Sequence, residues 1–241
     1  MKPVCYVTTS WDDGHPLDLR LAAMLASHGI PGTFYVPRQC DRRVMCPAQT
    51  RELAGAFEIG AHTLTHPRLT DLRQPDAEDE IRGSKDYIQE TTGRRCSVFA
   101  PPGGYFTAGH IDAAARAGFA GFRTTELMSL SPPVRRNGLA LLATTLQIYE
   151  HSPASFLCNA LKRRRPENFL SWLQYARGRT LVSATDRLLD HAIATGGVLH
   201  IWGHSWEIEE RGLWAPLGFI LCRLAERRDY CRMVTNAELA A

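Results

Sequence analysis

The sequence lacks long apolar runs, closely paired cysteines and any strong excess of charge. No stretch approaches the ~20 consecutive apolar residues that span a bilayer. The opening MKPVCYVTTSW contains neither the apolar segment nor the cleavage site of a signal peptide. The seven cysteines are odd in number and show no CxxC spacing, a usage typical of reduced thiols. We therefore expect a cytoplasmic protein with no transmembrane segment.

A nucleic-acid partner and a multidomain chain are not expected either. The formal net charge is only +3, and the 241 residues contain no repeat, low-complexity tract or Gly/Ser linker. With 44% hydrophobic and 22% charged residues, the chain can bury a substantial core, and we expect one domain over 1–241. The dense basic run KRRR at 162–165 is interpreted as a solvated face. Contact with an anionic substrate or a membrane surface is the alternative.

Short apolar runs alternate with helical patterns along the chain. Strands are predicted at 4–9, 32–37, 57–62, 97–102, 118–125 and 198–204, with another inside 139–149. Helices are predicted at 17–29, 48–56, 75–93, 107–118 and 213–227, with another in the second half of 179–197. This alternation indicates parallel strands with helical crossovers, hence an α/β fold, but it does not decide whether the sheet is open or closed. The segment 153–180 gives no clear prediction.

Polar residues collect where five of these strands end. They are Asp12 and Asp13, His62 and His66, the run Pro101–Tyr105, Arg123 with two threonines, and His204–Glu207. The carboxyl ends of parallel strands meet on one face of a β/α fold. We therefore expect these side chains to form one site.

The phrase HTLTH places His62 and His66 four residues apart, which we interpret as one side of a helical turn. Two imidazoles and one carboxylate form a three-ligand metal site that leaves a position for water, and Zn²⁺ suits this donor set. Of the adjacent Asp12 and Asp13, one can then bind the metal while the other accepts a proton from water. His204 is a candidate general acid; a buried histidine bonded to the backbone is the alternative.

Four blocks of the sequence carry a family resemblance. SWDDG at 10–14, HTLTH at 62–66, APPGG at 100–104 and IWGH at 201–204 occur in the order found in polysaccharide deacetylases. The chain resembles this family, carbohydrate esterase family 4 with its nodulation-type chitooligosaccharide deacetylase homology domain, from residue 4 to about 207. The resemblance implies a deformed (β/α) barrel of about seven parallel strands.

The resemblance also implies roles for residues. It implies a divalent metal on Asp13, His62 and His66, most simply Zn²⁺, with Co²⁺, Ni²⁺ or Mn²⁺ as alternatives. Asp12 would be the catalytic base and His204 the acid that protonates the departing amine. In the third block, Pro102, Gly103 and Tyr105 would shape the groove, and a backbone N–H near Tyr105 would help to stabilise the oxyanion.

The chain departs from the family pattern in its substrate-binding half. Ala100 stands where the family has an arginine that orients the base, and we hypothesise that Arg123 takes over that role. The family has a further block with an Asp and a Trp, between the third and the last of those above, and it has no clear counterpart here. Either Trp202 or Trp206 stacks on a sugar ring, or these indoles are buried. Glu207 either hydrogen-bonds His204 or caps the next helix, and His200 has no assigned role.

These features together predict a metal-dependent hydrolase. We expect it to remove an N-acetyl or related N-acyl group from a small amino sugar or from a lipid- or nucleotide-linked glycan. The alternatives are a deformylase or amidase acting on another small C–N substrate with the same metal site, and a non-catalytic sugar-binding homologue.

Overall fold

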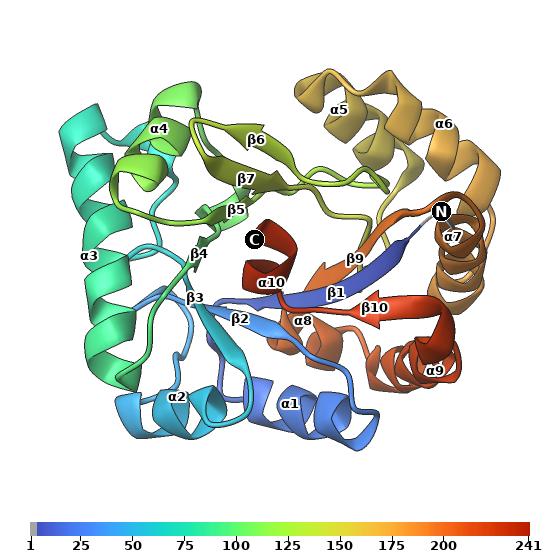
Figure 1. Cartoon of the computed structure of the whole chain (residues 1–241), viewed down its shortest axis with the longest axis horizontal. Coiled ribbons are helices and arrows are strands. Elements are labelled where there is room, and N and C mark those ends of the chain that lie inside the picture. The colour runs from blue at the N-terminus through green and yellow to red at the C-terminus, as the bar shows by residue number, and fades with distance from the viewer. Residues whose placement is uncertain (1–3) are drawn as a thin grey trace.

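The computed structural model describes residues 4–241, and its strands form one strongly curled sheet (Figure 1). The strands in these residues are β1 (Cys5–Asp12), β2 (Thr33–Val36), β3 (Glu58–Ala61), β4 (Val98–Phe99), β5 (Gly121–Arg123), β6 (Val134–Arg136), β7 (Leu139–Leu142), β8 (Leu146–Gln147), β9 (Gly197–Gly203) and β10 (Cys231–Met233). Their order is β6-β7-β5-β4-β3-β2-β1-β9-β8, and β10 pairs with β1. Every pairing is parallel except that of β6 with β7.

One short chain segment joins the two sides of this sheet. β7 pairs with β5 on one side, β8 pairs with β9 on the other, and only three residues separate β7 from β8. Within that bend, the Thr145 N–H donates to His200 O at 2.8 Å. The single strand predicted inside 139–149 is therefore two strands, because the segment crosses from one side of the barrel to the other. The fold is the expected α/β deformed barrel, with β6 and β10 as unpredicted additions.

Helices surround the barrel (Figure 1). They are α1 (Asp18–Ser27), α2 (Pro47–Ala54), α3 (Gln74–Thr92), α4 (Ala108–Arg116), α5 (Pro153–Arg163), α6 (Pro166–Tyr175), α7 (Leu181–Thr195), α8 (Ser205–Glu210), α9 (Trp214–Glu226) and α10 (Asn236–Ala240). Single 3₁₀ turns cover Leu69–Asp71, Pro102–Gly104 and Arg228–Tyr230. The predictions of α1, α2, α3, α4, α7 and α9 are confirmed, whereas α5, α6, α8 and α10 were not predicted. No helix of residues 4–241 has both the length and the apolar character to cross a membrane.

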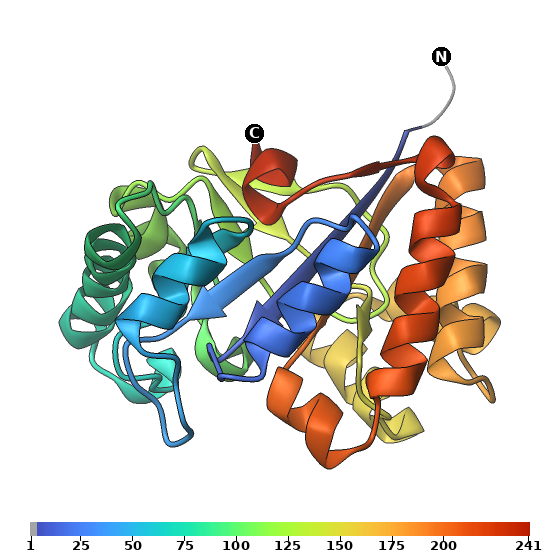
Figure 2. The same cartoon turned by 90° about the horizontal axis from the view of Figure 1, so that it is seen from below.

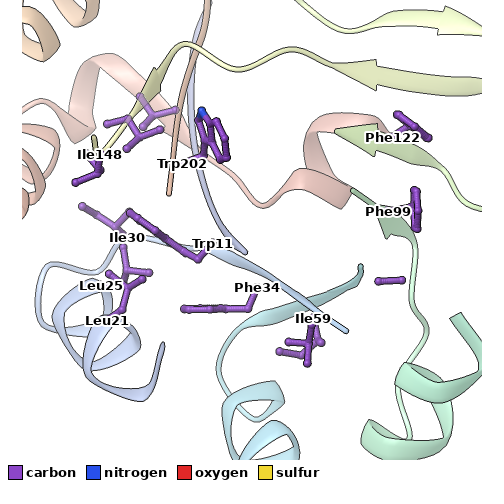
Figure 3. Close-up of a cluster of buried hydrophobic side chains, with 14 of the residues drawn as sticks. Trp11, Leu21, Leu25, Ile30, Phe34, Ile59, Phe99, Phe122, Ile148 and Trp202 are labelled. Atoms are coloured by element: carbon purple, nitrogen blue, oxygen red, sulfur yellow. The ribbon is translucent and has the colours of Figure 1, made fainter. Parts of the chain in front are cut away.

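The main hydrophobic core lies between the outer face of the sheet and these helices. Figure 3 shows Trp11 and Phe34 from β1 and β2 beside Leu21 and Leu25 of α1, and all four side chains are fully buried. The periodic apolar face of α1 meets alternate side chains of the strands. This packing fixes the strands whose carboxyl ends carry the polar residues.

The amino-terminal end of the barrel is closed by α10. Asn236 lies inside it, where Tyr35 Oη donates to Asn236 Oδ1 at 2.8 Å and Asn236 Nδ2 donates to Thr8 Oγ1 at 2.9 Å. Ala240 packs on Ala140 and Leu142. In Figure 2, α10 lies at the opposite end from the arrowheads of β1 and β2. The carboxyl ends of the strands are therefore the end at which a ligand can enter.

The region left open by the sequence contains the helical hairpin α5–α6. Phe156 and Phe169 stack on Trp172, with ring centroids 5.4 and 5.2 Å apart. The contact of Phe156 in α5 with Trp172 in α6 joins the two helices, and Phe169 packs on Trp172 within α6. The hairpin follows β8, so its α5 helix begins near the carboxyl end of the barrel.

Candidate metal centre and catalytic site

Asp13, His62 and His66 form a compact cluster at the carboxyl end of the barrel. One ligand atom from each lies within 4.8 Å of the others. Asp13 Oδ1 is 3.5 Å from His62 Nε2 and 3.0 Å from His66 Nε2. The structure therefore brings together the three residues to which the sequence analysis assigned a metal.

The two histidines do not share a helical turn, so that expectation was wrong. They lie in a loop after β3 in which Thr63 has φ 64° and His66 has φ 59°. Glu80 stabilises this loop, because its carboxylate accepts the Leu64 and Thr65 N–H groups at 2.7 and 2.9 Å. The loop still brings the two imidazole centroids to 5.0 Å. The spacing predicted the proximity of the rings but not the backbone that produces it.

The exit from β1 is similarly constrained. Asp13 has φ 77° and Gly14 has φ 59°. A Cβ on Gly14 would lie 2.8 Å from Val36 Cγ1, so glycine is required for the turn. A non-glycine residue in the left-handed region is uncommon and is concentrated at functional sites. Asp13 and His66 both have this conformation.

Neighbouring groups orient the candidate ligands. His62 Nδ1 donates to Ala100 O at 2.7 Å, which leaves the Nε2 lone pair facing the cluster. Trp206 Nε1 donates to Asp13 Oδ2 at 2.8 Å and leaves Oδ1 near both imidazoles. Burial opposes ionisation of Asp13, but His62 and His66 hold the pKa of this carboxyl below its usual range. Such outer hydrogen bonds are usual around metal ligands.

The cluster fits a tetrahedral metal ion. Bonds of about 2.0–2.1 Å to nitrogen and oxygen give a tetrahedron with edges of about 3.3 Å, close to the measured 3.0 and 3.5 Å between ligand atoms. His66 Nε2 is buried and makes no hydrogen bond within residues 4–241, although Asp13 Oδ1 lies 3.0 Å from it. A buried nitrogen without a partner is costly unless a ligand occupies its lone pair. The donor set of two imidazoles and one carboxylate suits Zn²⁺.

Asp12, the last residue of β1, lies beside this cluster and not after the strand as predicted. It is buried, and its Oδ2 accepts a hydrogen bond from the guanidinium of Arg123, which is also fully buried. Asp12 Oδ1 is buried and has no partner within residues 4–241. Arg123 also lies against the rings of Tyr35 and Trp202, at 5.2 and 4.9 Å. The hypothesised arginine therefore contacts Asp12 directly.

His204 lies across from Asp12, with its Nε2 4.0 Å from Asp12 Oδ2. Its Nδ1 is 2.5 Å from Glu207 Oε2. Burial lowers the pKa of His204, but the hydrogen bond to Glu207 and the charges of Asp13 and Asp12 outweigh it and raise the pKa to about 9. Of the two alternatives for Glu207, the structure adopts the hydrogen bond to His204. Gln147 Nε2 donates to the same Glu207 oxygen at 3.0 Å and restrains it.

The two tryptophans considered for stacking on a sugar ring, Trp202 and Trp206, contact other groups of the protein. Trp202 is 6% exposed, which favours the buried alternative for this residue. Trp206 is half-buried, and the guanidinium of Arg42 lies 3.4 Å from its ring centroid. His200 lies deeper in the barrel, where it bonds Ser10 Oγ and Ala143 O, each at 2.9 Å. Burial lowers the pKa of His200 to about 3, so it is a neutral structural group.

The third-block loop borders the site from the β4 side. Gly103 and Gly104 have φ 59° and 67°, and a Cβ on Gly104 would lie 1.9 Å from Thr125 Oγ1. Pro102 is buried and Tyr105 is half-buried. The Tyr105 N–H, near which an oxyanion donor was expected, donates to Pro102 O at 3.3 Å within the turn. The loop is therefore rigid, with its Tyr105 side chain partly exposed.

Several residues that support the site were not singled out from the sequence. Arg163 donates to Gly104 O and Thr125 Oγ1 at 2.8 and 2.7 Å, which anchors the third-block loop to α5. Asp18 is fully buried and accepts from Ser205 Oγ at 2.5 Å, joining α1 to α8. The one available signal was the KRRR run, which contains Arg163. Asp18 had no sequence signal, because its contact with Ser205, one of the polar residues expected at the end of the 198–204 strand, depends on the position of α8.

The arrangement resembles known structures of the same architecture. A candidate polysaccharide deacetylase from Mycobacterium smegmatis superposes with a TM-score of 0.68 and 16% identity, covering 100% of this chain and 90% of that one. A family 4 carbohydrate esterase from Streptomyces lividans, in complex with acetate, gives 0.53 and 19%, covering 92% and 88%. A pseudoenzyme of carbohydrate esterase family 4 from Bacillus anthracis gives 0.59 and 15%, covering 100% and 67%. At these identities the likeness shows a shared fold.

Sequence comparison is more specific for the first half of the chain. YlxY, an uncharacterised protein of Bacillus subtilis strain 168, is 28% identical over 96 residues, which is 40% of this chain and only 30% of YlxY. Residues 2–122 match the sequence model of the family described as polysaccharide deacetylase. That match contains Asp12, Asp13, His62 and His66 but ends before Arg123 and His204. Since it covers half of the chain, and the fold agrees with it over the whole length, the chain belongs to the polysaccharide deacetylase family.

Proposed function

We propose that this chain is a divalent-metal-dependent hydrolase that removes an N-acetyl or related N-acyl group from an amino sugar or glycoconjugate. The observation that carries the proposal is the pairing of two clusters. Asp13, His62 and His66 lie within 4.8 Å of one another, and the candidate base and acid, Asp12 and His204, are 4.0 Å apart beside them. A protein that only binds sugar has no need of both clusters.

Asp13, His62 and His66 would hold the metal, and Zn²⁺ fits their donor atoms best. When bound, the metal supplies Lewis acidity toward the amide carbonyl and lowers the pKa of water. The chain itself fixes the geometry of these ligands through the Ala100 carbonyl and the Trp206 indole. These restraints support a preorganised site.

Asp12 would act as the general base. Arg123 holds one carboxylate oxygen, and the other, Oδ1, is left without a partner in residues 4–241. A fixed carboxylate with one unoccupied oxygen can accept the proton of the attacking water. Arg123 therefore has a positioning role in this proposal.

His204 would act as the general acid. The raised pKa of about 9 keeps its ring protonated at neutral pH, and Glu207 fixes the ring through Nδ1. Nε2 is then the atom that donates a proton to the departing amine. A carboxylate base and an imidazolium acid 4.0 Å apart can provide the two proton transfers that hydrolysis requires.

The proposal also covers the domain organisation, the substrate and the location of the protein. We infer a single catalytic domain over 1–241 that acts on a small amino sugar or on a lipid- or nucleotide-linked glycan in the cytoplasm. The cysteine usage of the sequence supports the location. Trp202 is buried and the ring of Trp206 is covered by Arg42, which supports a compact substrate better than a long polymer that needs exposed stacking platforms.

The test is metal analysis combined with product detection. Protein purified without chelator is expected to contain about one divalent transition metal per chain and to release acetate from N-acetylated amino sugars. Chelation should abolish release, and added Zn²⁺ or Co²⁺ should restore it. Formate release or ring opening without acetate release would instead identify the deformylase or amidase alternative.

A non-catalytic homologue is the rival from another class. The similar structures include a pseudoenzyme of this fold and a mutant of it with restored enzymatic activity, so the fold alone does not establish catalysis. Absence of stoichiometric metal, together with no metal-restored hydrolysis of any substrate, would favour the rival.

A further inference from the structure

The ring of Tyr105, in the third-block loop, contacts two cations. Arg68 Cζ is 4.7 Å from the ring centroid, and Lys162 Nζ is 4.0 Å from it. Arg68 is in the loop that carries His66, and Lys162 is in the last turn of α5. Tyr105 thus joins the ligand-bearing loop to the KRRR run, which the sequence analysis left as a solvated face or an anion contact.

These cations have no acidic partner. Within residues 4–241, neither Arg68, Lys162 nor Arg163 forms an ion pair, and the Arg163 guanidinium bonds only to Gly104 O and Thr125 Oγ1. Glu126, the acid of the adjoining cavity, is engaged by Arg165 and Asn168. Glu126 also acts on Arg163 through its charge, but three neighbouring positive charges outnumber this one acid and attract anions.

The charges also affect one another. Burial lowers the pKa of Lys162, and the positive charges of Arg163 and Arg68 lower it further. Other arginines of the surface do have acidic partners: Arg73 lies 2.8 Å from Asp76, and Arg82 lies 2.6 Å from Asp79. What sets Arg68, Lys162 and Arg163 apart from other cations is that they gather around Tyr105 and the third-block loop.

A cavity of about 300 Å³ adjoins the cations. Its lining includes Phe106, Thr124, Lys162, Arg163 and Arg165. The cavity therefore provides room beside Lys162 and Arg163 for a charged group of the substrate and what is attached to it.

We propose that Arg68, Lys162 and Arg163 form a subsite for the phosphate or diphosphate group of a phosphorylated amino sugar. The inference rests on the proposed function, since it names the substrate class of that site. Three cations balance a dianionic phosphate better than a single carboxylate, and Arg and Lys are the residues that bind phosphate. The phosphate can belong to a nucleotide or to a lipid carrier.

The test compares the binding of N-acetylglucosamine 1-phosphate with that of N-acetylglucosamine to the full chain by calorimetry. We expect the phosphorylated sugar to bind at least about tenfold more tightly, as charge-assisted hydrogen bonds predict. Arg68→Gln and Lys162→Gln should each reduce the preference, and the double variant should remove it. These variants keep Asp13, His62 and His66, so any phosphate contact with a metal ion is common to all of them.

The glutamine side chains retain much of the stem that packs on Tyr105, so the variants are expected to fold. Arg82→Gln, which removes an exposed charge from α3, is the matched control and should leave the preference unchanged. Equal binding of the two sugars by the wild-type chain would overturn the proposal. So would a preference that survives in the double variant.

Two further ligands distinguish the sources of the phosphate. A uridine-diphosphate-linked and a short prenyl-phosphate-linked N-acetylglucosamine should both bind more tightly than the neutral sugar, and the tighter of them identifies the carrier. Binding of neither above the neutral sugar contradicts the subsite. A preference without hydrolysis of any substrate would contradict the proposed function alone, whereas hydrolysis without a preference would contradict the subsite alone.

Discussion

Arg123 at the end of β5 reaches across the barrel to Asp12 at the end of β1, although three strands separate β1 from β5 in the sheet. Both side chains are almost completely buried. The position after β4 where the family has an arginine is filled by Ala100, whose carbonyl accepts from His62. The positive charge beside the base therefore comes from a different strand in this chain.

Replacement of Arg123 tests this relationship. Arg123→Ala leaves a buried carboxylate without its partner, a change that costs about 3–5 kcal/mol. We expect kcat to fall at least tenfold while metal content, measured by mass spectrometry, stays close to that of the wild type. Arg136→Ala, which breaks the half-exposed pair with Asp112, is the control and should cost no more than about 1 kcal/mol. An unchanged kcat in Arg123→Ala would exclude the positioning role.

Substitutions of the two adjacent aspartates should have different effects on metal content and turnover. Asp12→Asn is expected to retain metal and lose nearly all turnover, because an amide cannot accept the proton. Asp13→Asn is expected to lose metal, since Oδ1 of Asp13 is the atom closest to both imidazoles. Metal content and acetate release would be measured on the same preparations. Loss of metal in Asp12→Asn but not in Asp13→Asn would reverse the assignment of the two carboxylates.

Removal of either imidazole should have a distinct signature. His62→Ala and His66→Ala are expected to lose both metal and activity, with at least a tenfold weaker affinity for Zn²⁺ in a chelator competition. His110→Ala is a matched control, because His110 is also buried but bonds only the local backbone at Thr107. Normal metal binding in His66→Ala would remove this residue from the ligand set.

The sequence predicted the candidate site better than it predicted the backbone around it. Residue type and strand-end position were enough to group Asp13, His62 and His66, because parallel strands bring their carboxyl ends together. The helical turn assigned to HTLTH was wrong, since Thr63 and His66 adopt left-handed conformations that spacing cannot reveal. The acceptor for His62 is the carbonyl of Ala100, and a backbone group carries no residue-type signal.

In the fold, too, the elements that depend on tertiary contacts could not be predicted from local sequence patterns. Helices with a regular apolar face, such as α1 and α9, were predicted within a few residues of their bounds. The α5–α6 hairpin was not, because its packing depends on the stacking of Phe156 on Trp172, a tertiary contact between the two helices. The bend between β7 and β8 likewise follows from closure of the barrel, which no local pattern encodes.

The pH dependence of activity should follow the protonation of the His204 ring. Its pKa, raised to about 9 by Glu207 and the nearby aspartates, lies above the ~6.5 of free imidazole. Activity that needs the protonated ring is therefore present at neutral pH and is lost as the pH rises through about 9. Glu207→Gln keeps a polar partner for Nδ1 but removes its charge, so the alkaline limb of kcat/KM should move about one unit toward neutral pH. Glu209→Gln changes an exposed acid of the same helix and should leave the limb in place, and an unshifted limb in Glu207→Gln would show that His204 is not the acid.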